Sequence, residues 1–210
     1  MLSIIQAAGW PIWPLLLCSI VAVALILERF ISLRTIKVTP PKLLMEALSV
    51  SSHGLPAPDV VSQLEANSAL GEVLASGMHA LNSNPRCTED EMRGAIEGAG
   101  REVAHRLERY LPALATIASA APLLGLLGTV IGMIEIFGSQ TGGATGANPA
   151  QLAQGISIAL YNTAFGLIVA IPTLIFWRYF RARVDGYLLT LEISAEHMAR
   201  HLVALKNGKF

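Results

Sequence analysis

The sequence predicts an all-α membrane protein with three transmembrane helices, and its charges carry that prediction. Only 14% of the 210 residues are charged and the mean hydropathy is +0.53, whereas soluble domains carry about 25% charged residues. Three runs, 1–27, 110–134 and 136–177, contain no Asp, Glu, Lys or Arg. Each holds enough apolar residues for a helix of about 20 residues, the length that crosses a bilayer. The low charge also argues against a nucleic-acid-binding or disordered protein.

The first span is predicted at Trp10–Leu27, so that 1–34 comprises the N-terminus and this helix. A cleaved secretory signal is the alternative interpretation. Signals carry basic residues before their apolar core, and no Lys or Arg precedes Glu28. The segment is therefore predicted to stay in the protein as a span.

Residues 35–109 are predicted to form a helical loop between the first two spans. Prolines separate short helices in its first half. Thr88, with Glu91 three residues later, has the spacing of a capping box that begins a helix. That helix, Glu89–Leu111, is expected to continue directly into the second span. We expect helical extensions of the spans here, and no compact second domain.

The second and third spans are predicted within 110–177, joined by a short loop, 138–155, rich in Gly, Ser, Thr, Asn and Gln. The third span, Ile156–Trp177, is expected to continue as a helix through 178–210. Apolar residues recur there at spacings of three and four, at Leu188, Leu191, Ala195, Met198 and Leu202. We expect this stripe to belong to a cytoplasmic helical bundle formed by the extensions of spans two and three. A helix lying on the membrane surface is the alternative.

The basic residues predict the orientation in the membrane. All fifteen Lys and Arg residues lie between spans one and two or after span three. Because basic residues are retained on the cytoplasmic side, we expect the N-terminus and the 138–155 loop to be periplasmic. The 35–109 loop and the C-terminus are then cytoplasmic.

Small residues mark one face of each of the last two spans. They recur at Ala118, Ala121, Gly125, Gly128 and Gly132, and at Gly155, Ala159, Thr163, Gly166 and Ala170. Such faces allow close packing of helix backbones. Because Thr129, Asn162 and Thr163 lie among them, a narrow pore with polar lining groups is the second interpretation. Glu135 is either an acid at the outer mouth of that pore or an anchor at the membrane interface.

No enzyme, cofactor or metal site is predicted. The chain has no Gly-rich phosphate loop, nucleophile elbow or pair of catalytic acids. His197 and His201 stand four residues apart, as metal ligands on a helix do, but no third ligand accompanies them.

Two stretches, Pro122–Phe137 and Leu152–Pro172, resemble the second and third spans of the MotA/TolQ/ExbB proton channel family. The three-span topology fits its ExbB and TolQ branch. Pro122 and Pro172 match the family, and Thr129 and Thr163 match a pair of threonines that faces the partner helix.

The resemblance implies a homopentamer in a bacterial inner membrane, with spans two and three lining a central pore. A dimer of an ExbD-like single-span protein would occupy the pore, and proton flow through its aspartate would energise a TonB-like protein for outer-membrane transport. A TolQ-like task in envelope maintenance and a non-conducting membrane scaffold are the alternatives.

One position departs from the family. The third-span motif has a glutamate where this chain has Ile158. An isoleucine holds no proton, so we expect the partner's acid alone to titrate at mid-span. Thr129, Thr163 and Asn162 would then solvate it.

Overall fold

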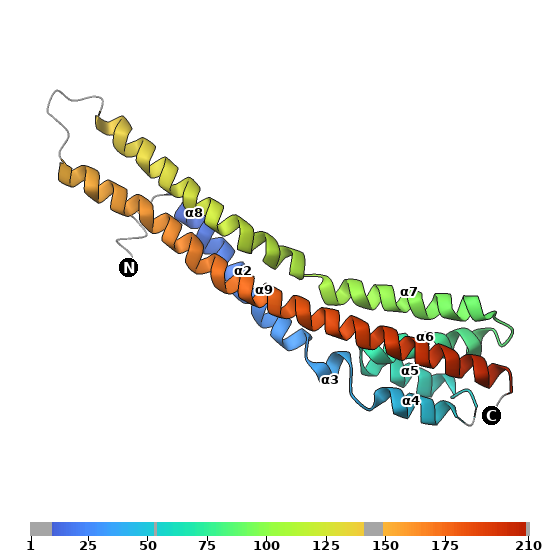
Figure 1. The fold of residues 1–210 in the computed structure, drawn as a ribbon. Coiled ribbons are helices and arrows are strands. Elements are labelled where there is room, and N and C mark those ends of the chain that lie inside the picture. The colour runs from blue at the N-terminus through green and yellow to red at the C-terminus, as the bar shows by residue number, and fades with distance from the viewer. Residues whose placement is uncertain (1–9, 53, 141–148, 209–210) are drawn as a thin grey trace. The chain divides into compact units, whose positions relative to one another are not determined.

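The computed structural model describes residues 10–52, 54–140 and 149–208, and for 139–140, 149–152, 154 and 158 it describes the backbone only. The described residues form helices joined by turns and short loops, with no strand among them (Figure 1). In chain order the helices are α2 (Ile12–Ser32), α3 (Thr35–Val38), α4 (Leu43–Ser51), α5 (Pro58–Asn67), α6 (Ala69–Ser83), α7 (Glu89–Glu108), α8 (Leu111–Gln140) and α9 (Pro149–Lys206). The all-helical prediction is confirmed.

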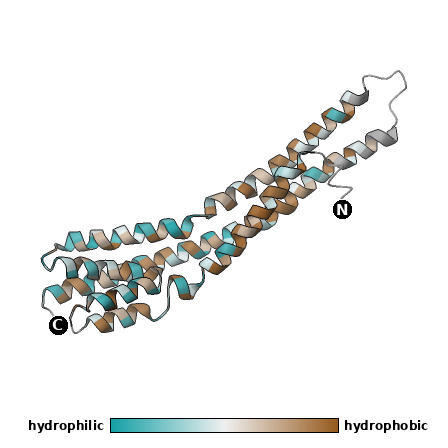
Figure 2. Ribbon diagram, turned by 180° about the vertical axis from the view of Figure 1, so that it is seen from behind, coloured by the Kyte–Doolittle hydropathy of each residue, from teal (hydrophilic) through white to brown (hydrophobic). Residues whose placement is uncertain are grey.

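Three helical stretches are long and apolar enough to cross a membrane, as predicted. They lie in Ile12–Ser32, Glu89–Gly138 and Gly155–Lys206. Figure 2 shows the hydrophobic residues concentrated on α2, α8 and the first half of α9. Helix α2 continues five residues beyond the predicted span, through the charged pair Glu28 and Arg29.

The chain divides into two compact units, and the first holds the apolar helices. It comprises Met1–Arg29 and Tyr110–Tyr179, which supply α2, α8 and the first part of α9. Its packed centre contains buried Leu15, Ala121 and Ala170, one from each helix. Partly buried Leu124, Phe165 and Val169 surround them.

The second unit comprises Phe30–Arg109 and Phe180–Phe210. The expectation that this part has no compact domain is wrong. Helix α6 packs against both α5 and α7, and buried Val73, Leu74 and Met78 line its inner face. The end of α9 completes this core, since Met198 and Leu202 have no exposed surface. The apolar stripe of α9 therefore belongs to a helical bundle.

The beginning of α7 was predicted correctly and its end was not. The Thr88 hydroxyl accepts a hydrogen bond from the Glu91 amide, and the Glu91 carboxylate accepts one from the Thr88 amide. The helix ends at Glu108, and a turn at Arg109 and Tyr110 separates it from α8. Pro112 gives the reason, because a proline ring clashes with the carbonyl four residues earlier, which here belongs to Glu108.

The continuation of the third span into the C-terminal region is confirmed. Helix α9 has 58 residues and runs to Lys206. It contains Pro172, and Thr173 beside it donates a hydrogen bond of 2.7 Å to the Val169 carbonyl. At the predicted 138–155 loop, α8 reaches Gln140 and α9 begins at Pro149, while 141–148 lie outside the described residues.

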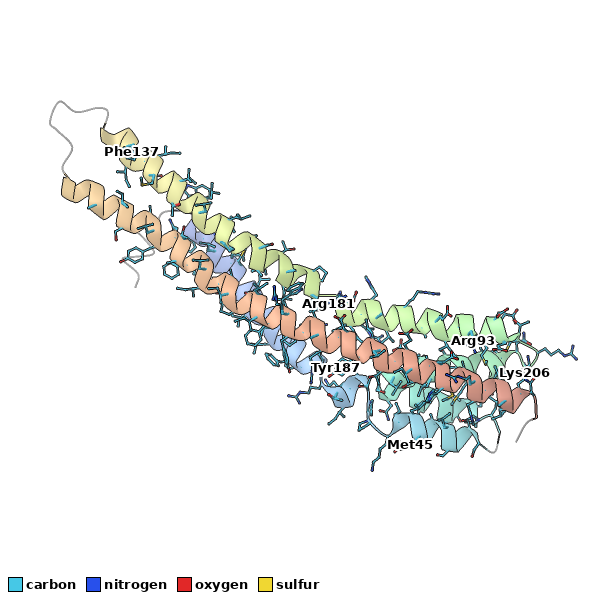
Figure 3. The ribbon with its side chains drawn as sticks, viewed as in Figure 1. Met45, Arg93, Phe137, Arg181, Tyr187 and Lys206 are labelled. Carbon is cyan, nitrogen blue, oxygen red and sulfur yellow. The ribbon has the colours of Figure 1, made fainter. Side chains whose placement is uncertain are left out.

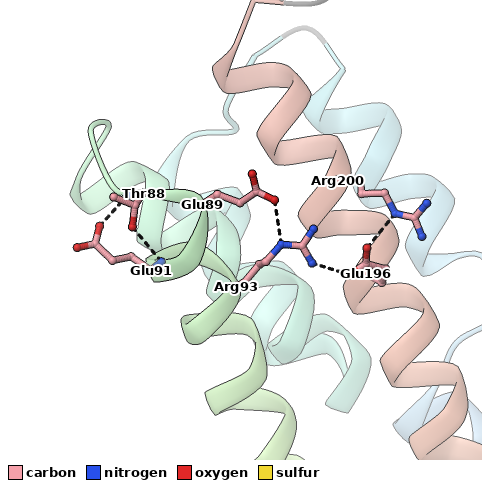
Figure 4. A network of polar contacts seen from close by, with 6 residues as sticks. All are labelled: Thr88, Glu89, Glu91, Arg93, Glu196 and Arg200. Atoms are coloured by element: carbon pink, nitrogen blue, oxygen red, sulfur yellow. Dashed lines mark hydrogen bonds and ion pairs between the residues drawn. The ribbon is translucent and has the colours of Figure 1, made fainter.

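An ion-pair network joins α7 to α9 in the second unit (Figure 4). The Arg93 guanidinium donates to Glu196 at 2.7 Å and to Glu89 at 3.0 Å, and Arg200 pairs with Glu196 at 3.0 Å. The hydrogen bond from Arg93 holds the pKa of Glu196 below its ordinary value of 4.5. The carboxylate of Glu196 is therefore favoured in the folded state.

This contact predicts a local loss of stability in acid. A carboxyl group with a lowered pKa in the folded state stabilises the fold above its ordinary pKa, and the effect disappears as pH falls through the lowered value. We expect backbone amides of α7 near Arg93 to lose protection from hydrogen exchange below about pH 4.5. Glu196→Gln should remove this pH dependence. Glu192→Gln, one turn earlier on α9, should keep it, and an unchanged profile in Glu196→Gln would contradict the assignment.

Candidate functional site at the contact between α8 and α9

Helices α8 and α9 touch backbone to backbone along their small residues. A Cβ atom added at Gly166 would lie 2.6 Å from the Ala121 carbonyl oxygen, and one at Gly125 would lie 2.8 Å from the Asn162 carbonyl oxygen. Real Cβ atoms essentially never approach other atoms so closely. These two glycines are therefore required for the helix spacing, as small residues are at close helix crossings in membranes.

The contact continues from Gly128 to Gly132. A Cβ at Gly128 would meet the Asn162 side chain at 2.8 Å, and one at Gly132 would meet the Ala159 Cβ at 3.2 Å. Asn162 and Ala159 are 2% and 3% exposed. All five predicted packing residues thus lie at this intrachain contact. Their lining of a pore stays a prediction.

The two threonines at the contact differ in their hydrogen bonding. The Thr129 hydroxyl donates to the Leu126 carbonyl of its own helix at 2.7 Å. The Thr163 Oγ1 atom is enclosed and has no hydrogen-bond partner in the part of the chain that the structure describes. Leaving a buried polar group unsatisfied costs about 1–3 kcal/mol. The Thr163 hydroxyl is therefore the one of the two that is left unsatisfied at this contact.

Thr129 borders a shallow apolar groove on α8. The groove has a volume of about 600 Å³ and is lined by Thr129, Val130, Met133, Ile134, Phe137 and Gly138. Phe137, near the end of α8 in Figure 3, is 53% exposed, and Ile134 is 65% exposed. Apolar side chains exposed in this way fit a helix face that contacts lipid or another protein helix.

Three further predictions concern Glu135, Ile158 and metal binding. Glu135 is exposed on α8, which is compatible with both interpretations given for it. The side chain of Ile158 lies outside the described residues. No group of three or more His, Cys, Asp or Glu side chains that could hold a metal occurs within the described parts of the chain.

Arg29 is a polar residue whose position the sequence did not indicate. It is 3% exposed, and its guanidinium donates two hydrogen bonds to the Glu28 carboxylate and lies 4.8 Å from the centre of the Tyr110 ring. A buried charge requires such partners. The adjacent acid was the one visible signal in the sequence, while Tyr110 is brought there by the fold.

Comparison with known proteins gives a consistent family. Residues 65–193 match the model of the MotA/TolQ/ExbB proton channel family. The chain is 33% identical to an ExbB-like biopolymer transport protein of Synechocystis over 84% of this chain and 83% of that protein. It is 30% identical to the biopolymer transport protein exbB1 of Vibrio cholerae over 80% of this chain and 73% of that protein. It is 37% identical to the Tol-Pal system protein TolQ of Haemophilus influenzae over 49% of this chain and 46% of that protein.

Proposed function

This chain belongs to the MotA/TolQ/ExbB proton channel family, a family of channels and not of enzymes. From that premise we propose the task of this chain. The chain works with an ExbD-like single-span protein and uses the proton motive force to energise a TonB-like protein for outer-membrane transport. The support for this task is that relatives named ExbB or ExbB-like match about four fifths of the chain.

The observation that carries the proposal is the Thr163 hydroxyl. Its Oγ1 is enclosed at the α8–α9 contact without a partner among the described residues, whereas Thr129 is bonded within its own helix. A threonine in a helix has two favourable χ1 rotamers, so rotation can turn the hydroxyl toward an incoming carboxyl group. Thr163 would in this way solvate the acid of the partner helix.

The proposed mechanism depends on the lack of charged residues in the third span. Residues 136–177 contain no Asp, Glu, Lys or Arg. An ionised carboxylate is costly to move along such an apolar wall, and protonation removes most of this cost. The partner acid would therefore move only when it is neutral and stop where hydroxyls and the Asn162 amide can hydrogen bond to it. This alternation couples proton flow to motion between the subunits.

The proposed assembly places five copies around the partner dimer in a bacterial inner membrane, with the N-terminus periplasmic and the C-terminus cytoplasmic. Three candidate spans and the distribution of the basic residues support the membrane location and the orientation of the termini. Glu135 would lie toward the outer mouth.

Replacing Thr163 with valine should reduce proton flux at least about tenfold, since hydrogen bonds to charged groups contribute about 1.5–3 kcal/mol. The measurement uses the chain and its cognate partner in proteoliposomes with a pH-sensitive dye. Thr163→Ser keeps the hydroxyl and should retain most of the flux. Thr190→Val is the matched control, because Thr190 donates only to the Gly186 carbonyl of its own helix and is exposed.

Two outcomes would contradict parts of this proposal. Wild-type flux from Thr163→Val would exclude the solvating role. A wild-type complex that assembles with its partner and conducts no ions would favour the scaffold alternative. The ExbB-like and TolQ-like tasks separate by complementation: the first restores TonB-dependent uptake, and the second restores resistance of the outer envelope to detergents.

A further inference from the structure

The segment that follows α2, residues 34–45, carries positive charge on its exposed side. Arg34, Lys37 and Lys42 are all exposed. No Asp or Glu occurs between Glu28 and Glu46 in the sequence. Within the described residues none of these three basic side chains forms an ion pair. Their charge is therefore not compensated by the fold.

The same segment exposes large apolar side chains between its basic residues. Ile36 is 79% exposed and Met45, labelled in Figure 3, is 69% exposed. Neighbouring Val38 and Leu43 are 2% and 6% exposed. One side of the segment therefore packs into the second unit. The exposed side chains of the segment include both cations and large apolar groups, which is the composition of surfaces that lie at a membrane interface.

Hydrogen bonds hold this segment in place. The Tyr187 hydroxyl donates to the Leu33 carbonyl at 2.9 Å and lies 3.1 Å from the Thr35 hydroxyl oxygen. Helix α3 also packs against α6. The exposed side chains are thus displayed by an ordered part of the chain, which lowers the entropic cost of binding.

The chain keeps the beginning of the segment next to a candidate span. Helix α2, the first candidate span, ends at Ser32, and two residues extend at most about 7 Å. Arg34 must therefore lie close to the end of α2. If α2 crosses the bilayer, as the proposed function requires, Arg34 lies at the level of the lipid headgroups.

We propose that residues 34–45 form a binding surface for anionic phospholipids. Arg34, Lys37 and Lys42 pair with lipid phosphates, and Ile36 and Met45 enter the boundary between headgroups and acyl chains. Basic residues directly beside a span attract anionic lipids in this way. The occupant is a lipid and not an acidic protein, because an acidic protein surface gives no reason for two exposed apolar side chains among the cations.

The test counts bound lipid on the full chain. The protein is reconstituted in nanodiscs of phosphatidylcholine with an equal molar amount of phosphatidylglycerol, extracted in mild detergent and analysed by native mass spectrometry. We expect wild type to retain phosphatidylglycerol preferentially. Removal of one charge should lower its affinity about fivefold, and the triple variant R34Q/K37Q/K42Q should lose the preference. The matched control R86Q/R101Q/R200Q removes three other exposed basic residues of the second unit and should retain it.

Two further arms identify the chemistry. Ile36→Ser combined with Met45→Ser keeps the charge and should lower lipid retention several-fold. Inorganic phosphate at millimolar concentration should displace no lipid, and displacement would show a site for free anions instead. Retention of phosphatidylglycerol by the triple variant at the wild-type level would overturn the proposal.

The outcome is separable from that of the proposed function. Proton flux with the cognate partner is measured on wild type and on the same triple variant. The lipid counts of both proteins do not depend on the partner. Failure of wild-type flux with normal lipid retention would contradict only the channel assignment. Circular dichroism verifies the fold, and if the triple variant is unfolded, the three single variants each test the fivefold effect.

Discussion

Gly166→Ala is expected to destabilise the apolar unit by about 1–3 kcal/mol, the cost of overpacking a close contact. The added Cβ would lie 2.6 Å from the Ala121 carbonyl oxygen and 3.2 Å from the Gly125 Cα atom. Both are backbone atoms, which a rotamer change does not move. The helices α8 and α9 must therefore separate, and this separation weakens their contact along its whole length.

Gly186→Ala is the matched control for this change. Gly186 lies on the same helix, and a Cβ there would meet no atom within 4 Å. Alanine is favoured over glycine inside a helix by roughly 1 kcal/mol, so this variant should be slightly more stable than wild type. Thermal unfolding in nanodiscs, followed by circular dichroism, gives both shifts. Equal melting temperatures for the two variants would mean that the close approach of α8 and α9 does not stabilise the protein.

Leu202→Ala is expected to destabilise the second unit by about 2–5 kcal/mol, the usual cost of truncating a fully buried leucine. Leu202 has no exposed surface. Its Cδ1 would be 2.9 Å from a Cβ at Gly77, where the Ile96 side chain also approaches to 2.8 Å. The residue thus fills the space where α6, α7 and α9 meet. Hydrogen exchange should show faster opening of all three helices.

Leu189→Ala tests whether the effect comes from burial. Leu189 lies on the same helix but is 58% exposed, and substitutions at such positions usually change stability by less than about 0.5 kcal/mol. The two variants remove the same atoms. Similar losses of protection would contradict the assignment of Leu202 to the core.

Much of the fold could be predicted because its signals are local. Charge-free runs predicted the three candidate spans, and Thr88 with Glu91 located the beginning of α7. The break before α8 also has a local cause, Pro112, although the helix was predicted to continue through Leu111. The compactness of the second unit was missed because it depends on Leu202 of α9 lying against Gly77 of α6, far away in the chain.

The candidate site was predictable in composition and not in contacts. Small residues at spacings of three and four indicated that the second and third spans approach closely. They gave no means of deciding between an intrachain contact and a pore lining. The structure shows the intrachain contact directly, and the pore lining depends on other chains.

The sequence by itself determined that this protein is helical, that three of its segments suit a membrane, and to which family it belongs. These properties depend on residue types and spacings along the chain. Only the tertiary structure decided which polar groups are satisfied: Arg29 has Glu28 and Tyr110 as partners, and Thr129 has its own backbone. Thr163 Oγ1 has none among the described residues. The physical reason is that solvation of a buried polar atom is set by neighbours that folding brings from other parts of the chain.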